Sequence, residues 1–378
     1  MEQKRPIAYY RQSNSNRIYK LIYEQGCMSK PEIAHHLELS LPTVQMSVKR
    51  MQEEGLLEET GTLETSGTGR RPVAVSCVKD AYAAIGIDIT LHHIKAVMVG
   101  IDGEDFYSIY LREQFENTDE YARKIGAVVE QLLADTSFPT ERVLGVGISI
   151  PGITSRDGSI MISSNKIKVR NLLCSDIAKY IIYPCFLTND ANAAGVAEMW
   201  IRKELQHVAY IALSDTVGGS VILNRKLCEG DNQRSGEFGH IMVHPGGRLC
   251  HCGRKGCLSA YCSANILMES TKSSLDEFFK ELESGNTRLE PIWDEYLKDL
   301  AIGITQMRMI LDCDVVLGGY VGAYMEKHLT RLQREVQKLS PFGDKGEFIQ
   351  TCRYKKSASA VGAALPYIEK FIDEVGVV

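Results

Sequence analysis

The 378-residue sequence lacks an apolar run of the roughly 20 residues that a membrane-spanning helix needs. Its most apolar stretches, residues 181–187 and 208–223, are either short or interrupted by Asp215. It also lacks a recognisable signal peptide, because its first residues are charged and polar. We therefore expect a cytoplasmic protein that has no membrane partner.

An excess of basic charge is also absent. The chain has 43 Lys and Arg against 48 Asp and Glu, and the net charge of −5 gives no overall attraction to nucleic acid. Any contact with DNA therefore requires a local group of basic side chains. The eleven cysteines stay reduced in a cytoplasm, so a disulfide framework is not expected. The length favours two or three domains.

The first 77 residues carry the signals of two short helices separated by a tight turn. Ser29 and Glu32 form the pattern of a capping box, and Ser40 precedes a second helix that has Pro42 in its first turn. Two short capped helices joined in this way are typical of a helix-turn-helix motif. Strands at residues 56–58 and 72–77, with a Gly- and Thr-rich segment between them, predict a wing.

The second predicted helix separates a core face from an outer face. Val44, Val48 and Met51 follow helical spacing and are expected to be buried. Outer polar residues would read base edges in the major groove, and basic residues of the helix and wing would neutralise phosphates. The residues assigned to DNA are Thr43, Gln45, Met46, Lys49, Arg50, Arg70 and Arg71. Residues 1–75 hold ten basic and nine acidic side chains, so a protein-interaction module remains the alternative.

Beyond residue 78 the composition changes and strands alternate with helices. The pattern predicts strands at residues 84–88, 95–101 and 143–150, and a helix at residues 121–133. Such alternation to the end of the chain indicates an α/β architecture.

One His and three Cys gather within eighteen residues. His240, Cys250, Cys252 and Cys257 supply the imidazole and thiolates that tetrahedral zinc prefers. Four such ligands leave no open position, so the expected zinc is structural. A set of buried free cysteines is the alternative, and on spacing alone His244 or His251 could replace His240.

On these motifs the whole chain resembles the ROK family (repressors, open reading frames and sugar kinases), in its repressor branch. Residues 236–240 with the three cysteines resemble the zinc signature of that family, and Thr188-Asn189-Asp190-Ala191-Asn192-Ala193-Ala194 resembles its sugar-site motif. The other matching segments are Pro151-Gly152, Leu317-Gly318-Gly319 and Gly69-Arg70-Arg71-Pro72.

The resemblance implies a winged helix-turn-helix followed by a two-lobed, actin-like (ribonuclease H-like) sugar-kinase fold, assembled as a homodimer or tetramer. The expected domains are residues 1–78 for DNA, 79–190 for the first lobe, completed by a C-terminal helix at 357–378, and 191–356 for the second lobe with the zinc motif. The resemblance places the sugar against Asn165, Asn189, Asp190, Glu237 and His240. Side chains of these types can bind sugar hydroxyls as donors and acceptors. Capping of a helix is the alternative role for Asn189-Asp190.

Three departures from the family pattern bear on activity. The first phosphate loop of the family's kinases, Asp-x-Gly-Gly-Thr, is here Asp88-Ile89-Thr90-Leu91-His92, which has lost both glycines. The second is Ser214-Asp215-Thr216-Val217-Gly218-Gly219, where Asp215 would repel a phosphate. The family's usual Glu after the last zinc cysteine is replaced by Ser259, which leaves the identity of the sugar open.

Together these features predict a repressor that binds double-stranded operator DNA and a small carbohydrate effector, and that does not phosphorylate it. Asp190, which matches the general base of the kinases, would then hold a sugar hydroxyl without catalysis. The alternatives are an active ATP-dependent sugar kinase with an accessory DNA-binding domain, and a repressor controlled by a partner protein.

Overall fold

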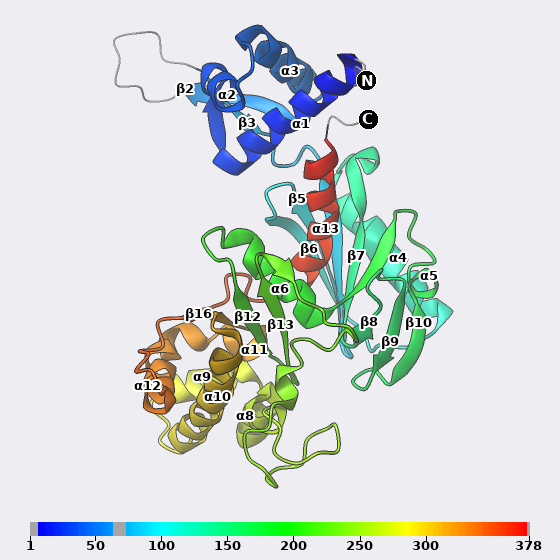
Figure 1. The fold of residues 1–378 in the computed structure, drawn as a ribbon. Helices are drawn as coiled ribbons and strands as arrows, with labels where there is room; N and C mark the ends of the chain where they lie inside the picture. The colour runs from blue at the N-terminus through cyan, green and yellow to red at the C-terminus, as the bar shows by residue number, and fades with distance from the viewer. Residues whose placement is uncertain (1–6, 63–72, 376–378) are drawn as a thin grey trace.

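The computed structural model describes residues 7–62 and 73–375 (Figure 1). A small N-terminal domain lies beside a larger part in which two β-sheets are flanked by helices. This arrangement confirms the predicted α/β class with an N-terminal helix-turn-helix. Within the described residues, no helix combines the length and the apolarity needed to cross a bilayer.

The N-terminal domain contains three helices and an antiparallel sheet of order β1-β3-β2. Its elements are α1 (Ile7–Gln25), β1 (Cys27–Ser29), α2 (Lys30–Leu37), α3 (Leu41–Glu53), β2 (Leu57–Thr62) and β3 (Val73–Cys77). The capping box of Ser29 and Glu32 is formed, and Ser40 caps α3, as predicted. The expected core face of α3 is buried. Strand β1 was not predicted, because three residues are too few to show an alternating pattern.

The first lobe is built on a five-stranded sheet of order β11-β7-β4-β5-β6, in which β4, β5 and β6 are antiparallel and β4, β7 and β11 are parallel. Its strands are β4 (Ala83–Ile89), β5 (His93–Gly100), β6 (Asp105–Arg112), β7 (Val143–Ile150) and β11 (Cys185–Asn189). A small sheet and three helical segments complete it: β8 (Ile153–Thr154), β9 (Ile160–Ser164), β10 (Val169–Leu173), α4 (Asp119–Thr136), η1 (Thr140–Arg142) and α5 (Cys174–Ile177). The strands and the helix predicted from sequence correspond to β4, β5, β7 and α4.

The second lobe repeats this topology with the order β14-β13-β12-β15-β16. Its strands are β12 (Val208–Leu213), β13 (Val217–Leu223), β14 (Lys226–Leu227), β15 (Asp314–Gly318) and β16 (Ile349–Thr351). Its helical segments are η2 (Phe238–His240), α7 (Ser259–Cys262), α8 (Ala264–Thr271), α9 (Leu275–Glu283), α10 (Glu290–Leu311), α11 (Gly319–Gly322), η3 (Met325–His328) and α12 (Leu329–Leu339). The two lobes thus repeat one strand topology, although no repeat is visible in the sequence.

Two helices, α6 (Asp190–Ile201) and α13 (Ala358–Glu374), pack between the sheets (Figure 1). Helix α13 lies directly on the first-lobe sheet, where a Cβ on Gly86 would stand 1.8 Å from the carbonyl oxygen of Ala360. It also touches α6, where a Cβ on Gly362 would stand 1.7 Å from the carbonyl oxygen of Ala193. Glycine therefore allows the two helices to approach to backbone contact.

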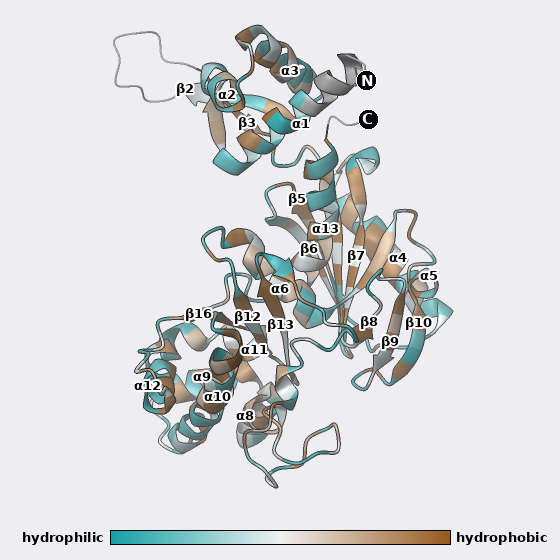
Figure 2. Cartoon of the chain, viewed as in Figure 1, coloured by the Kyte–Doolittle hydropathy of each residue, from teal (hydrophilic) through white to brown (hydrophobic). Residues whose placement is uncertain are grey.

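The hydrophobic interior runs through the strands of both sheets (Figure 2). One buried cluster joins the N-terminal domain to the larger part without a break, since it contains Ile22 and Val75 together with Val97 and Ile368. The N-terminal domain consequently shares a core with the lobes instead of hanging from a linker.

Candidate metal centre, sugar cleft and DNA-binding face

The metal centre brings together the four residues that the sequence predicted. The ligand atoms of His240, Cys250, Cys252 and Cys257 all lie within 4.8 Å of one another. The Sγ atoms of Cys252 and Cys257 are 3.8 Å apart, and Cys250 Sγ lies 3.9 Å from His240 Nδ1. Zinc–sulfur bonds of about 2.3 Å give a tetrahedral S–S edge of about 3.8 Å, so the cluster has the dimensions of a zinc site.

Tight turns bring these ligands together. Gly253 and Gly256 have φ values of +84° and +93°, a region in which other residues are strained. A Cβ on Gly256 would also stand 1.9 Å from the carbonyl oxygen of His244. Short bridges pair Met242 with Cys257 and Leu249 with Lys255, and so close the loop on itself.

The two alternative histidines occupy other positions. His244 Nε2 lies 2.6 Å from a carboxylate oxygen of the buried Asp299, outside the cluster. His251 Nδ1 lies 3.5 Å from Cys250 Sγ, but its nitrogens do not fall within the four-ligand group. The geometry therefore favours His240 as the fourth ligand.

Asn189 and Asp190 lie where β11 ends and α6 begins. The Asn189 side chain accepts a hydrogen bond from the Asn192 amide at 2.9 Å and donates one to the Gly152 carbonyl oxygen at 2.9 Å. It therefore caps α6, the alternative role that the sequence left open. Asp190 accepts a hydrogen bond from the Ala191 amide through Oδ1, which leaves Oδ2 without a protein donor among the described residues.

Charge in the cleft acts strongly on Asp190. Desolvation raises the pKa of its carboxyl group, and the neighbouring carboxylates of Asp88 and Glu237 raise it further, whereas Lys166 lowers it. Burial likewise raises the pKa of Glu237. The side chains that act on Asp190 come from both lobes, so these charges gather in the space where the two lobes face each other.

Glu237 connects the metal centre to this space. Its carboxylate lies 3.7 Å from His240 Nε2, and therefore the ring that offers Nδ1 to the metal group faces Glu237 with its other nitrogen. Asn165 is exposed in the turn between β9 and β10, beside Lys166. The five residues predicted to bind sugar thus include three close to the cleft charges, one helix cap and one exposed turn residue.

The first phosphate loop of the family pattern is a closed turn. Thr90 Oγ1 accepts hydrogen bonds from the amides of His92 and His93 at 3.2 and 3.1 Å, and lies 2.9 Å from His93 Nδ1. The opposite nitrogen of His93 is 3.5 Å from Asp88, whose other oxygen accepts a hydrogen bond from Ser149 Oγ at 2.6 Å. The backbone amides of Thr90, His92 and His93 are consequently bonded to protein atoms.

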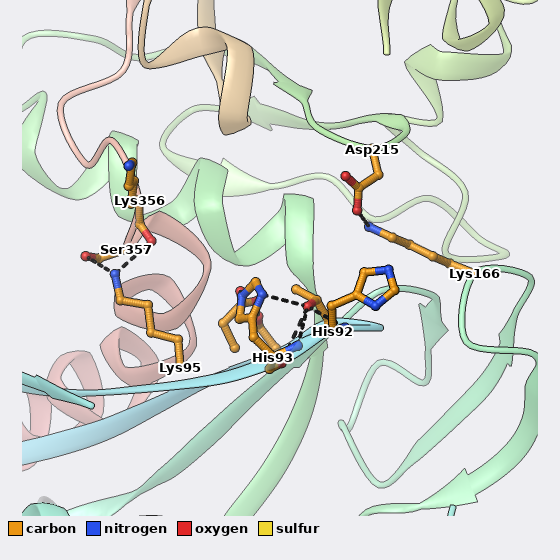
Figure 3. Close-up of polar contacts among 10 residues, drawn as sticks. His92, His93, Lys95, Lys166, Asp215, Lys356 and Ser357 are labelled. Carbon is orange, nitrogen blue, oxygen red and sulfur yellow. Dashed lines mark hydrogen bonds and ion pairs between the residues drawn. The ribbon is translucent and has the colours of Figure 1, made fainter. Parts of the chain in front are cut away.

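The second phosphate loop is also occupied by the chain's own charges (Figure 3). Lys166 of the first lobe forms an ion pair with Asp215 of the second lobe, at 3.2 Å and with both side chains largely buried. Nearby, Lys95 donates hydrogen bonds to the Lys356 carbonyl oxygen and to Ser357 Oγ at the start of α13. Sequence reasoning missed Lys166, although its position next to Asn165 was a usable signal.

Ser259 plays a local structural part. Its buried hydroxyl accepts a hydrogen bond from the Val217 amide at 3.1 Å, which ties the segment after the metal loop to the start of β13. This bond leaves Ser259 facing the protein interior.

On the DNA-binding face, the outer surface of α3 is open. Gln45, Met46 and Lys49 are exposed, and Met46 keeps 60% of its surface accessible although it is apolar. Thr43 is half-buried, and its hydroxyl lies 2.8 Å from that of Ser40.

Arg50 differs from the other basic residues predicted for DNA. Its guanidinium donates a hydrogen bond to Ser15 Oγ of α1 at 3.1 Å, and its Nε lies 3.5 Å from Glu54. Arg50 thus connects α3 to α1. Arg70 and Arg71 lie outside the described residues.

Fold and site together define a winged helix-turn-helix joined to a two-lobed, kinase-like domain. Residues 84–369 match the ROK family, and residues 12–58 match a winged helix-turn-helix DNA-binding family. Since the first match spans most of the 378 residues, this chain belongs to the ROK family.

Several named relatives are repressors. The chain is 26% identical over 266 residues to the xylose repressor of Caldicellulosiruptor bescii, covering 69% of this chain and 66% of the relative, just under two thirds. It is 27% identical over 268 residues to the xylose repressor of Bacillus subtilis, covering 70% and 69%. It is 25% identical over 266 residues to the DNA-binding transcriptional dual regulator NagC of Escherichia coli, covering 68% and 64%.

Solved structures share the fold. A ROK family transcriptional regulator, a homolog of the E. coli MLC protein, matches 98% of both chains with a TM-score of 0.77 and 20% identity. A ROK family glucokinase from Streptomyces griseus, in complex with glucose and AMPPNP, matches 75% of this chain and 98% of its own with a TM-score of 0.65 and 23% identity. These likenesses confirm the actin-like, two-lobed fold.

Proposed function

We propose that this chain is a sugar-responsive transcriptional repressor that binds operator DNA through its winged helix and a carbohydrate in its cleft, without phosphorylating it. One observation carries the proposal, and it has two parts. The winged helix shares a hydrophobic core with the two-lobed domain, and in that domain the segments that match the phosphate loops are bonded to the chain's own side chains. The relatives named as xylose repressors and as the regulator NagC support the same class.

On the DNA side, Thr43, Gln45 and Met46 approach base edges in the major groove. Lys49 and Arg50, with Arg70 and Arg71 of the wing, neutralise phosphates. The exposure of the α3 face supports this role. A homodimer or tetramer would present two such helices to a palindromic operator, with half-sites about one helical turn or a multiple apart.

On the sugar side, the carboxylate of Asp190 accepts a hydrogen bond from a sugar hydroxyl. Glu237 and His240 line the opposite wall of the cleft, and Asn165 and Asn189 lie at its edge. Carboxylates and carboxamides suit a ligand whose hydroxyls both donate and accept. The free oxygen of Asp190 supports this assignment, because it has no protein donor among the described residues and a sugar hydroxyl would supply one.

The metal at His240, Cys250, Cys252 and Cys257 is, in this proposal, structural zinc. A shell of three thiolates and one imidazole leaves no position open for substrate. The ion would fix the loop that carries Glu237 and His240, and so would hold the sugar-binding wall in place.

A kinase reaction is the second candidate, and the phosphate half of the cleft argues against it. Thr90 Oγ1 accepts hydrogen bonds from the His92 and His93 amides at the first loop, and Asp215 places a carboxylate in the second. Like charges at contact distance disfavour a nucleotide phosphate there. Asp190 is then a vestigial base that holds a hydroxyl.

The division into a DNA-binding domain (1–78), a first lobe (79–190, with the helix at 357–378) and a second lobe (191–356) belongs to the same proposal, as does a cytoplasmic location. In operation, sugar binding favours one closure of the lobes, and this closure changes operator affinity. Such a switch requires unequal sugar affinity in the two states.

A thermal-shift panel of neutral sugars and sugar phosphates tests the proposal, with D-xylose and N-acetylglucosamine as the first probes. Sugars that stabilise the wild type are then added to binding reactions with duplexes selected from genomic DNA. The expected result is stabilisation by at least one sugar, loss of that stabilisation in Asp190→Asn, and altered duplex affinity when the sugar is present. The proposal would be contradicted if no sugar stabilised the protein and no duplex bound to it.

A further inference from the structure

Helix α1 of the DNA-binding domain is fastened to the first lobe through the C-terminal end of α13. The Asn16 Nδ2 lies 3.1 Å from each of the carbonyl oxygens of Ile372, Asp373 and Val375, which share its two N–H donors. Lys20 adds an ion pair with Asp373 at 2.8 Å. Because α13 lies in backbone contact with the first-lobe sheet, these bonds tie the N-terminal domain to that lobe.

The same helix also touches the C-terminal end of α6. The rings of Tyr23 and Trp200 meet edge to face, with centroids 6.5 Å apart and planes at 62°. The ammonium group of Lys203 lies 5.7 Å from the centre of the Tyr23 ring. Burial raises the pKa of the Tyr23 hydroxyl, which is consistent with an enclosed contact.

The end of α6 belongs mechanically to the second lobe. Arg225, in the turn between β13 and β14, donates hydrogen bonds to the carbonyl oxygens of Met199, Arg202 and Leu205. The buried ion pair of Glu198 with Arg202 links the helix to the segment after β16, because Glu198 also accepts hydrogen bonds from the amides of residues 353 and 354. The end of α6 that carries Trp200 is therefore tied to the second lobe, whereas Tyr23 lies on the helix that is tied to α13 and the first lobe.

Trp200 is also seated against the first lobe by a turn shaped for it. Its indole N–H donates to the Asp102 carbonyl oxygen at 3.3 Å. Gly103, at a φ of +85°, leaves space for the ring, since a Cβ there would stand 2.3 Å from the indole nitrogen. The indole thus lies where the DNA-binding domain, the first lobe and α6 meet.

The two ends of α6 contact different parts of the protein. Its first residue is Asp190, in the cleft, and its last turn carries Trp200. Between them, Ala193 crosses α13 in backbone contact with Gly362, a natural pivot. We therefore expect a movement of the second lobe at the cleft to change the position of Trp200.

We propose that the Tyr23–Trp200 contact is the point at which lobe closure acts on the DNA-binding domain, so that these two residues position the winged helix according to the state of the cleft. The inference rests on the proposed function. Closure moves Trp200 relative to the anchors of α1 on α13, and the resulting push on Tyr23 tilts the domain. Neither residue touches the ligand or the DNA-binding face.

The test separates coupling from binding. Trp200→Leu and Tyr23→Leu remove the contact from either side, and the exposed Phe342→Leu of the second lobe is the matched control. For each protein, three dissociation constants are measured: for the sugar identified by thermal shift, beginning with D-xylose, for a selected duplex alone, and for that duplex with saturating sugar. Wild type and control are expected to show a duplex ratio of about tenfold or more. Both contact variants are expected to keep their sugar and duplex affinities while their ratio falls to about one.

A second measurement needs no sugar. A duplex of about 30 base pairs at low salt binds the protein through its phosphates, and hydrogen exchange then follows the amides of α6. Binding is expected to slow exchange in α6 of wild type and control, and to leave it unchanged in the contact variants. Contact variants that keep the wild-type duplex ratio or exchange response would overturn the inference. A wild type that binds no sugar would instead contradict the proposed function, and the exchange result would still decide the role of the contact.

Discussion

The two halves of the cleft, the metal side and the phosphate side, differ in whether their polar groups already have partners within the protein. On the metal side, the ligand atoms of His240 and three cysteines lie within 4.8 Å of one another, and Glu237 and Asp190 keep carboxylate oxygens that can accept hydrogen bonds from a ligand. On the side that matches the kinases' phosphate loops, the His92 and His93 amides are bonded to Thr90, and Lys166 is paired with Asp215. The metal side therefore keeps acceptors for a ligand, whereas the donors named on the phosphate side already have partners within the protein.

Under the proposed function, this difference is how a kinase-like fold would keep sugar recognition without phosphorylation. Phosphate binding depends on backbone amides, which a single hydroxyl can satisfy internally. Sugar binding depends on side chains, which persist as long as their supporting loop does. The sharpest ways to break this comparison are variants that act on one half only.

The largest effect is expected from Cys257→Ser. Loss of one thiolate should release the metal and loosen the loop that carries Glu237, with a cost above about 3 kcal/mol in the free energy of unfolding. Metal content by atomic spectroscopy and unfolding by denaturant measure the two consequences. Cys27→Ser, an exposed cysteine of β1, is the matched control and should change neither. Retained stoichiometric metal in Cys257→Ser would remove that residue from the cluster.

Asp190→Asn comes next and acts on the sugar alone. Replacing an ionised acceptor by an amide should weaken sugar binding by about 10- to 100-fold, as expected for a hydrogen bond to a charged group. Calorimetry measures the affinity, and thermal unfolding should show a folded protein. Unchanged sugar affinity would exclude Asp190 from the site.

A smaller effect concerns pH. Desolvation raises the pKa of Asp190, so its charged form, and with it sugar affinity, should be lost on acidification at a pH above the ordinary carboxyl range. Lys166 opposes this shift, and therefore Lys166→Met should move the midpoint of sugar binding to still higher pH. Affinity should fall by up to about tenfold per pH unit below the midpoint. A midpoint that does not move in Lys166→Met would show that the two groups do not interact.

The smallest effect is expected from Asp215→Gly, which restores one phosphate loop towards the family's glycine pattern. The turn closed by Thr90 remains, so neither wild type nor variant should hydrolyse ATP in a sugar-dependent manner. A coupled assay for ADP measures the turnover. Turnover in the wild type would establish the kinase alternative.

Much of this site could be predicted from sequence because its signals are local. Cys250 and Cys252 are separated by one residue, and turn glycines at 253 and 256 follow them. Ser29 and Ser40 predict the starts of the helices that they cap. Chemistry confined to a short segment needs no knowledge of tertiary contacts.

Contacts between distant segments could not be predicted in this way. Lys166 and Asp215 lie 49 residues apart in the sequence and on different lobes. The sequence around each residue therefore does not indicate that the two form a pair. Arg50 was assigned to phosphates on its charge, and its bond to Ser15 arises only when α1 packs against α3. Asn189 was assigned to sugar by resemblance, whereas its observed bonds are those of a helix cap.

The unbroken core that joins Ile22 and Val75 to Ile368 has a practical meaning for anyone who would build new sensors from this scaffold. A chimera cut at the chain connection near residue 78 would sever apolar contacts on both sides and expose them to water. Exchange of recognition specificity is better attempted by grafting the outer face of α3 onto the intact chain, or by transplanting α1 together with the last turns of α13 as one piece.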